Sequence, residues 1–252
     1  KIKTTLSPKG NSFAGKEIYD FGIAYRRLFN DLSVLKGTKE STFLSVGGKS
    51  QEIGKISLEI LREFGLECRD FLIDVGCGYG RLAEALLQWH KGKYLGTDVV
   101  PELLDYAKTN FGRDGRDFKL VDQLIIPVED TSVDMVCFFS VFTHLLHEQS
   151  FIYLKEVKRV LKIGGRVVFS FLDFKESAHL QHFEGSVSRL SSGHPLNVFM
   201  SEDLIRAWAD LLDFECEFVF GSKEKHGKGH PFSGFGQSIA CLRKSKESHL
   251  IP

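Results

Sequence analysis

Residues 71–81 read FLIDVGCGYGR, a short apolar run followed by a glycine at every second position. A short apolar run bounded by Gly or Asp is typical of a buried strand, so Phe71–Val75 predicts one. Gly76, Gly78 and Gly80 allow the backbone to turn sharply and to approach a ligand closely. The helix expected next would present unpaired N–H groups at its first turn. This segment therefore predicts a strand, a ligand-binding turn and a helix in succession.

Further apolar runs alternate with amphipathic helices along the chain. The expected strands are Phe71–Val75, Lys93–Asp98, Phe118–Val121, Met135–Phe139 and Arg166–Phe171. The expected helices carry the apolar stripes Leu82–Leu86–Trp89, Phe151–Leu154–Val157–Leu161 and Leu204–Trp208–Leu211, each suited to cover a sheet face. Alternating strands and helices imply a doubly wound α/β sheet with right-handed crossovers and helices on both faces.

The end of the chain departs from this alternation. Phe214–Phe220 and Ser238–Arg243 read as strands with no helix between them, so we expect them to be antiparallel. Ser201, followed by two acidic residues, predicts a helix N-cap. Lys158, Arg159 and Lys162 before Gly164-Gly165 predict the end of the preceding helix.

We divide the chain into an N-terminal extension, residues 1–50, and a main domain, residues 51–252. The extension shows no strand pattern, and we expect it to form a lid over the functional edge of the sheet. Residues 174–200 and 221–236 are connections longer than the fold needs, and long connections often carry function. We expect both to be insertions on the acceptor side of the site.

Charge and composition exclude several classes of protein. The 33 basic residues balance the 33 acidic ones, which argues against a nucleic-acid partner. The longest apolar run, Met135–Phe139, is far too short to cross a bilayer, so we expect no membrane partner. Five cysteines without C-x-x-C spacing favour free thiols in the cytoplasm, although Cys216 and Cys241 lie on strands expected to pair.

Three carboxylates follow the strand ends in a regular order. Asp74 lies two residues before the first glycine, Asp98 ends the second strand 18 residues after Gly80, and Asp122 ends the third. An acidic side chain at the end of the second strand is placed to accept hydrogen bonds from ribose hydroxyls. The three carboxylates and the glycine turn together indicate a nucleoside-containing ligand.

This pattern resembles the class I S-adenosylmethionine-dependent methyltransferases. The likeness continues through LVD at 120–122, VDMV at 133–136, SVFTHL at 140–145 and RVLKIGG at 159–165, where the family usually has Pro in place of Ile163. It covers residues 71–172 closely and 201–243 in outline. The resemblance implies a seven-stranded Rossmann-like sheet of order 3-2-1-4-5-7-6, with strand 7 antiparallel. It also implies S-adenosylmethionine as the cofactor and S-adenosylhomocysteine as the product.

The same resemblance implies roles for individual residues. Asp74 would anchor the glycine loop or reach the cofactor's amino group, Asp98 would bind the ribose, and Asp122 would accept from the adenine amino group. Ser140 would border the methionine portion and the methyl group, and Arg81 has an open role near the loop. The complete set of expected cofactor residues is Asp74, Gly76, Cys77, Gly78, Gly80, Arg81, Asp98, Val99, Asp122, Gln123 and Ser140.

Two other readings stay open. A nicotinamide-dependent dehydrogenase would show G-x-G-x-x-G, whereas the third glycine here comes one place early. A non-catalytic S-adenosylmethionine-binding module would keep the same loop and carboxylates. The nucleic-acid amino-methylating motif Asn/Asp-Pro-Pro-Tyr/Phe is replaced by Ser140-Val141-Phe142-Thr143.

The expected acceptor is a small molecule or sugar-containing metabolite, methylated on oxygen by in-line displacement. SVFTHL and FGQSIACLRK loosely resemble bacterial enzymes that act on glycans and secondary metabolites. His144, just after the fourth strand, is the first candidate general base, because an imidazole titrates near neutral pH. Asp173 is the second candidate. No metal site is expected, since His179, His182, His194, His226 and His230 lack a convincing set of partners.

Other side chains are candidates for the walls of the acceptor site. We expect Tyr19, Tyr25 and Arg26 in the lid, and Phe142, Phe174 and Phe183 beside the acceptor. The sequence leaves the oligomeric state open.

Overall fold

The structure is a computed structural model and describes residues 21–37, 51–188, 190, 197–220, 225–226, 230–231 and 235–245. Its helices are α1 (Phe21–Lys36), α3 (Gln51–Glu63), α4 (Arg81–Ala85), α5 (Pro101–Phe111), α6 (His147–Val160), α7 (Ser177–Ser188) and α8 (Glu202–Leu211). The main strands are β1 (Leu72–Val75), β2 (Tyr94–Asp98), β3 (Arg116–Leu120), β4 (Val133–Phe138), β5 (Leu161–Asp173), β7 (Phe214–Phe220) and β10 (Ser238–Lys244). Three two-residue strands complete the set: β6 (Phe199–Met200), β8 (Lys225–His226) and β9 (His230–Pro231).

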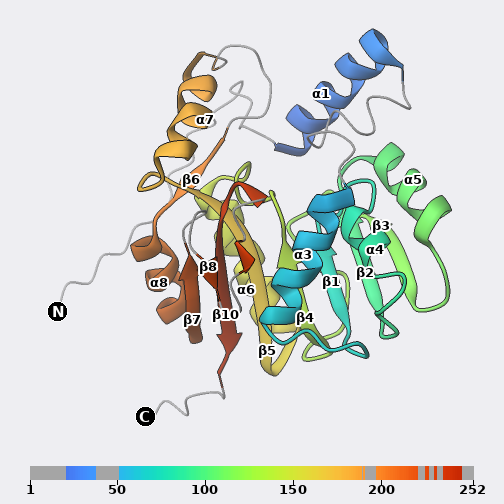
Figure 1. Ribbon diagram of the computed structural model, residues 1–252, viewed down its shortest axis with the longest axis vertical. Helices are drawn as coiled ribbons and strands as arrows, with labels where there is room; N and C mark the ends of the chain where they lie inside the picture. Colours follow the sequence, from blue (N-terminus) through green and yellow to red (C-terminus); the bar gives the residue numbers. More distant parts are fainter. Residues whose placement is uncertain are drawn as a thin grey trace, which may run out of the picture.

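The main strands form one sheet of order β3-β2-β1-β4-β5-β10-β7 (Figure 1). The strands from β3 to β5 are parallel, and β10 runs antiparallel to both of its neighbours. Counting β7 as the sixth strand and β10 as the seventh, the order 3-2-1-4-5-7-6 is confirmed. The antiparallel pairing of the last two main strands is confirmed with it.

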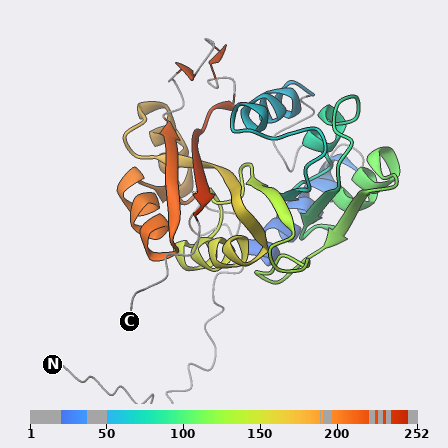
Figure 2. The same cartoon turned by 90° about the horizontal axis from the view of Figure 1, so that it is seen from below.

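Helices cover both faces of the sheet, as Figures 1 and 2 show. Neighbouring residues on one strand point to opposite faces, so each strand feeds two cores. Leu72 of β1 packs with α3, α4 and α5, whereas Ile73 packs with α6 and α8. On β4, Cys137 belongs to the same core as Leu72, and Val136 belongs to the same core as Ile73. Because both faces are covered, the central strands are buried runs rather than alternating ones.

Two helix ends differ from the prediction. The helix expected through Trp89 stops at Ala85, because Leu87 and Trp89 donate to carbonyls three residues back and the chain tightens into turns. The helix before Gly164-Gly165 already ends at Val160, and β5 begins at the next residue. Residues 162–165 then loop out of the ladder, with Gly164 at a φ of +81°, before pairing with β4 resumes.

The segment 174–200, expected to be irregular, contains α7 and β6. β6 adds to the carboxyl end of β5 in parallel, with Leu172 opposite Phe199. The N-cap expected at Ser201 is confirmed, since its Oγ accepts from the Leu204 N–H at 3.2 Å. All five cysteines are free thiols, and Cys216 and Cys241 pair across the ladder with Leu242 and Phe218. Within the described ranges, no helix is both long and apolar enough to cross a membrane.

The parallel strands end at one edge of the sheet, and α1 and α7 both lie at this carboxyl edge (Figure 1). Open α/β sheets bind ligands at this edge, in the crevice where the strand order reverses. Here the reversal falls between β1 and β4, which are neighbours in the sheet although far apart in the chain. The glycine loop follows β1 directly, so the candidate site begins there.

Candidate cofactor and active site

The loop after β1 has a conformation that only glycine adopts easily. Gly76, Gly78 and Gly80 have φ angles of +72°, +55° and +92°. The N–H groups of Gly76 and Cys77 both donate to the Thr97 carbonyl, at 2.7 and 2.9 Å, which fixes the loop against the end of β2. A Cβ on Gly76 would lie 2.4 Å from Cγ2 of Val141. The loop is therefore a tight backbone turn with no room for a side chain at its first glycine.

Asp98 holds this loop through both carboxylate oxygens. Its Oδ2 accepts from the Gly78 N–H at 2.9 Å, and its Oδ1 accepts from the Val100 N–H at 3.0 Å. The side chain is buried, and burial raises its pKa although the backbone donors oppose the shift. An ionised carboxylate has about four acceptor positions. The Val99 N–H also hydrogen-bonds to this carboxylate, so at least one position remains for a ligand, and loop support and ribose binding are compatible.

Asp74 has partners that its position before the loop did not indicate. Its Oδ2 accepts from the Tyr94 hydroxyl at 2.9 Å, and its Oδ1 lies 3.6 Å from the Cys137 thiol, so it links β1 to β2 and β4. Burial raises the pKa of Asp74 to about 6, the Asp98 carboxylate adds to the rise, and the Arg81 guanidinium opposes it. A buried carboxyl of this kind favours a cationic ligand group nearby, because the cation would stabilise its ionised form.

The remaining cofactor candidates lie along the ends of β2 and β3. Val99 is half-buried against a small cluster formed by Phe29, Tyr79, Val100 and Leu103. Asp122 and Gln123 are exposed, and the Gln123 carbonyl accepts from the Tyr153 hydroxyl at 3.4 Å. These side chains stand beyond the edge of the sheet and are accessible to a ligand lying across it.

Helix α1 packs on the same edge. Phe29 is buried against Tyr79, and Arg26 donates from Nη1 to the Val99 carbonyl at 3.4 Å. Burial, followed by the Asp98 charge, raises the pKa of Tyr25, while the Arg81 guanidinium opposes the rise. Arg81 itself lies 5.9 Å from the centre of the Tyr79 ring. The described part of the N-terminal extension thus places Tyr25 and Arg26 beside the cofactor candidates.

The end of β4 contains a strained residue held by two others. Ser140 has a φ of +60°, a conformation uncommon for residues other than glycine. Its N–H donates to Ser170 Oγ of β5 at 2.7 Å, and its Oγ accepts from Gln237 Nε2 at 3.1 Å. Gln237 was missed by the sequence reasoning, since nothing in its surroundings marks it. Only the pairing of β10 with β5 brings it to Ser140.

His144 lies near helix α1. It is half-buried, and its ring centre is 6.2 Å from that of Tyr25. Asp173, the second candidate base, is buried at the end of β5, where its Oδ1 accepts from the Lys175 N–H at 2.9 Å. Its own N–H donates to Nδ1 of the buried His179 at 2.9 Å. These contacts give Asp173 a local structural task at the start of α7.

The three phenylalanines expected beside the acceptor differ in their burial. Phe142 is fully buried against Phe138 and Phe169, so the expectation that it lines an acceptor pocket is wrong: it belongs to the core. Phe174 and Phe183 are exposed and contact each other edge to face. Tyr19 and His194 lie outside the described residues, as do the side chains of His226 and His230.

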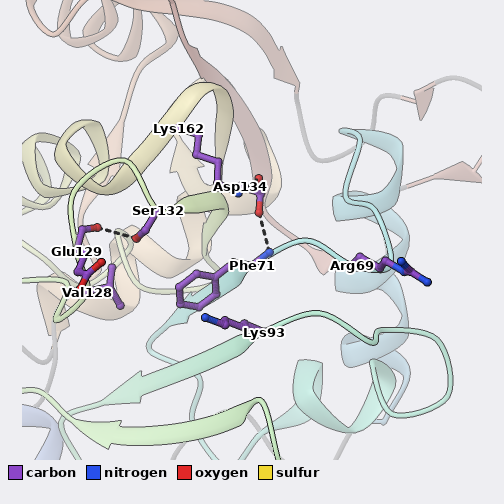
Figure 3. A pocket seen from close by; sticks show the side chains of 8 residues that line it. All are labelled: Arg69, Phe71, Lys93, Val128, Glu129, Ser132, Asp134 and Lys162. Carbon is purple, nitrogen blue, oxygen red and sulfur yellow. Dashed lines mark hydrogen bonds and ion pairs between the residues drawn. The ribbon is translucent and has the colours of Figure 1, made fainter.

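A separate hollow of about 510 Å³ lies at the opposite, amino edge of the sheet (Figure 3). Phe71 and Lys93, just before β1 and β2, line it together with Asp134 and Lys162, which form a 2.6 Å ion pair. None of the glycine-loop residues lines it, so we do not assign it to the cofactor. In the described part of the chain, no group of three His, Cys, Asp or Glu side chains is arranged to hold a metal ion.

S-adenosylmethionine fits the carboxyl-edge site on three observations. The turn after β1 has glycine at three positions of positive φ, Gly76, Gly78 and Gly80, and glycine lets a ligand approach the backbone closely. Asp98 keeps at least one acceptor position free for ribose hydroxyls. The raised pKa of Asp74 suits a ligand that brings positive charge, as an ammonium and a sulfonium do.

Comparison with known proteins agrees with this site. Residues 73–169 match a family model described as a methyltransferase domain. A methyltransferase-like protein of Schizosaccharomyces pombe is 30% identical over 108 residues, covering 43% of this chain and 40% of its own length. The malonyl-[acyl-carrier protein] O-methyltransferase of Hahella chejuensis is 26% identical over 166 residues, covering 66% of this chain and 57% of its own. The chain thus spans about half the length of these curated relatives.

Among solved structures, a chain of the Haloferax volcanii complex between the Trm112 methyltransferase activator and a methyltransferase aligns with a TM-score of 0.64. The alignment covers 89% of this chain and 99% of that one at 18% identity, so it speaks for the fold alone. The sheet order, the glycine loop with its two buried carboxylates and the matched residues lead to one conclusion. Residues 73–169 are similar to a methyltransferase domain, and these findings support a class I S-adenosylmethionine-dependent methyltransferase with S-adenosylmethionine as its cofactor.

Proposed function

We propose that this protein transfers a methyl group from S-adenosylmethionine to an oxygen atom of a small-molecule acceptor. The observation that carries the proposal is the Asp98 carboxylate, which holds the Gly78 N–H of the loop after β1 and keeps at least one acceptor position open. The fold alone would not carry it, because one fold supports many functions. The non-catalytic module stays as the alternative, and turnover separates the two.

In this proposal the cofactor lies across the carboxyl ends of β1, β2 and β4. Gly76, Cys77, Gly78 and Gly80 pass close to its methionine portion, with Asp74 acting as the buried counter-charge. Asp98 accepts from the ribose, Val99 packs on the adenine, and Asp122 and Gln123 meet the adenine edge. Arg81 balances the charge of the carboxylates, Tyr25 lies beside them as a neutral phenol, and Ser140 borders the methyl group.

Bound in this way, S-adenosylmethionine supplies an electrophilic methyl carbon on a sulfonium. The protein's part is to align the acceptor oxygen with it, and positioning contributes much of such a rate gain. His144 takes the hydroxyl proton of the acceptor as general base. Its ring stands beside Tyr25 of α1, so the lid helix and the base would meet the acceptor together.

Two classes of acceptor deserve comparison. The sequence reasoning favours a sugar-containing metabolite. The Hahella relative is named for methylation on oxygen of malonyl-[acyl-carrier protein], which adds an acyl compound as the second class. The neutral net charge supports neither nucleic acid nor another polyanion as the partner.

Isothermal titration with S-adenosylhomocysteine tests the cofactor assignment. We expect a dissociation constant in the micromolar range, about −8 kcal/mol. Tight binding of NADH in its place would overturn the assignment. Release of methyl-labelled product from S-adenosylmethionine, with acyl and glycosyl acceptors offered separately, then tests turnover; binding without any transfer would favour the non-catalytic module.

The His144→Gln variant tests the general base. Loss of a base costs about 10²–10⁴ in rate, so kcat should fall strongly while affinity for S-adenosylhomocysteine stays within about twofold. A structural histidine would instead lower stability or cofactor affinity. If a folded variant keeps more than about a third of wild-type kcat, His144 is not the general base. Another group would then accept the proton, or positioning alone would account for the rate.

A further inference from the structure

Helix α7 buries two polar residues and leaves its large apolar side chains exposed. Its buried residues are His179 and Ser186, whereas Leu180, Phe183 and Val187 are 41%, 42% and 59% exposed. Positions i, i+3 and i+7 share one face of a helix. Phe174, 52% exposed, contacts Phe183 with ring centres 5.3 Å apart and extends this face. We call Phe174, Leu180, Phe183 and Val187 the α7 stripe.

The burial of these two polar residues has a structural reason. Nδ1 of His179 accepts from the Asp173 N–H at 2.9 Å, and Ser186 Oγ accepts from the Asn197 N–H at 3.0 Å. The polar side of α7 thus fastens the helix to β5 and to the segment before β6. Phe199 of β6 stacks on Phe174 at 4.4 Å, which fixes the base of the stripe.

The α7 stripe is continuous with the site. Phe174 directly follows Asp173, the last residue of β5, at the edge where the methyl group is delivered in the proposed function. The Val198 N–H, next to Phe199, donates to the Thr143 carbonyl at 2.7 Å, one residue from His144. From Leu180 to Val187 the stripe extends about 10 Å along the helix.

The area of the α7 stripe and the lack of basic residues on α7 indicate which kind of partner could bind there. Four large side chains that are about half exposed offer roughly 400 Å², within the range of functional patches. A stable dimer needs about 800 Å² per partner, so a second copy would require more than the stripe. Helices that bind membranes carry Lys or Arg on their polar side, and SAHLQHFEGSVS of α7 has neither.

We propose that the α7 stripe binds an apolar chain of the acceptor, so that the substrate class is an acyl-type compound whose reactive oxygen lies beside His144. The inference rests on the proposed function. Helix α7 would then select acceptors by the length of their apolar chain. Discrimination between chains that differ by one methylene would be modest, as is usual for apolar contacts.

Titration with octanoate, decanoate and dodecanoate, below their micellar concentrations, tests the proposal without knowledge of the full acceptor. Affinity should increase about two- to fourfold for each added methylene, depending on how fully the chain is buried. The Phe183→Ser/Val187→Ser double variant should lose this length dependence. The matched control is Leu211→Ser on α8, a leucine that is 72% exposed away from the stripe, and it should retain the dependence.

Three results would overturn the proposal. The first is length dependence that is absent from the wild type or kept by the double variant. The second is a concentration-dependent dimer in sedimentation that the double variant abolishes, since a second copy would then cover the stripe. The third is a large loss of thermal stability in the double variant, because the chain itself would then cover it. S-adenosylhomocysteine affinity, measured on the same samples, reports failure of the proposed function separately.

Discussion

Replacement of Asp74 by Asn should remove the free-energy cost of ionising a buried carboxyl in the folded state, a cost that depends on pH. The ordinary pKa of an aspartate, 3.8, is raised to about 6 in Asp74, and burial is the main cause. The folded protein therefore holds a proton on Asp74 between about pH 4 and pH 6 that the unfolded chain has lost. Because the folded state binds more protons in this window, stability falls as the pH rises through it and stays lower above pH 6.

The magnitude follows from the same values. The difference between 3.8 and about 6 corresponds to about 3 kcal/mol, at about 1.4 kcal/mol per pH unit. The asparagine carbonyl can still accept from the Tyr94 hydroxyl, so the neutral forms are nearly equivalent. The variant should therefore resemble the wild type at about pH 4 and exceed its unfolding free energy by about 3 kcal/mol at about pH 7.5.

Urea unfolding across this pH range, followed by tryptophan fluorescence, measures the free energy of unfolding of variant and wild type. The contributions of all other titratable groups cancel in the difference between the two. Asp117→Asn is the control, since Asp117 is an exposed carboxyl on β3 of the same sheet. Its difference from the wild type should stay within about 0.5 kcal/mol at every pH. An Asp74→Asn difference as flat as that of the control would refute the reasoning.

The same substitution links to cofactor binding. If Asp74 is the counter-charge of a cationic ligand, the ligand binds its ionised form, and affinity for S-adenosylhomocysteine should fall by up to tenfold for each pH unit below about 6. In Asp74→Asn this fall should disappear. A wild-type affinity that does not change between about pH 5 and pH 7 would remove Asp74 from the cofactor's electrostatics.

Three further substitutions test the site. Gly76→Ala should lower the free energy of unfolding by about 1–3 kcal/mol more than Gly164→Ala in urea titrations, because both have positive φ but only Gly76 is crowded; equal losses would show that crowding is unimportant. Asp98→Ala should weaken S-adenosylhomocysteine binding by about 1–3 kcal/mol in calorimetry, and unchanged affinity would exclude Asp98 from the site. Ser170→Ala should destabilise the protein by about 1–3 kcal/mol in thermal unfolding, since it leaves the Ser140 N–H without its acceptor, and a neutral result would show that another group takes its place.

The sheet and the glycine loop were predictable because their signals are local. The central strands contain short apolar runs, such as Met135–Phe138 in β4, and glycine at 76 and 80 is the residue type that adopts a positive φ most easily. The position of Asp98 at the end of a strand was predictable, and its role in binding the ribose stays a prediction. Its second task, binding the Gly78 N–H, was not predictable, because it depends on how two loops meet.

Helix α7 escaped prediction for a physical reason. Amphipathic patterns are interpreted on the premise that apolar residues face the core. In α7 the buried positions are His179 and Ser186, which serve as hydrogen-bond acceptors for neighbouring backbone, so the pattern points the wrong way. The early end of the helix at Ala85 escaped for a related reason: Leu86 stays buried in the turns that follow, so burial continues where the helix does not.

The two halves of the site differ in how they are encoded. Residues that would bind the cofactor follow the strands β1, β2 and β3. These strands are consecutive in the chain and adjacent in the sheet, in the order β3-β2-β1, so motifs that follow one another in the sequence also lie side by side. In the proposed function the acceptor half consists of Tyr25 of α1, His144 after β4 and Gln237 before β10, which only the assembled sheet brings to one edge. Acceptor choice can therefore change through substitutions in α1, α7 or the approach to β10 without any change in the glycine loop. Variants in these three segments should alter which acceptor is methylated and leave affinity for S-adenosylhomocysteine almost constant, whereas variants of Asp74 or Asp98 should do the reverse.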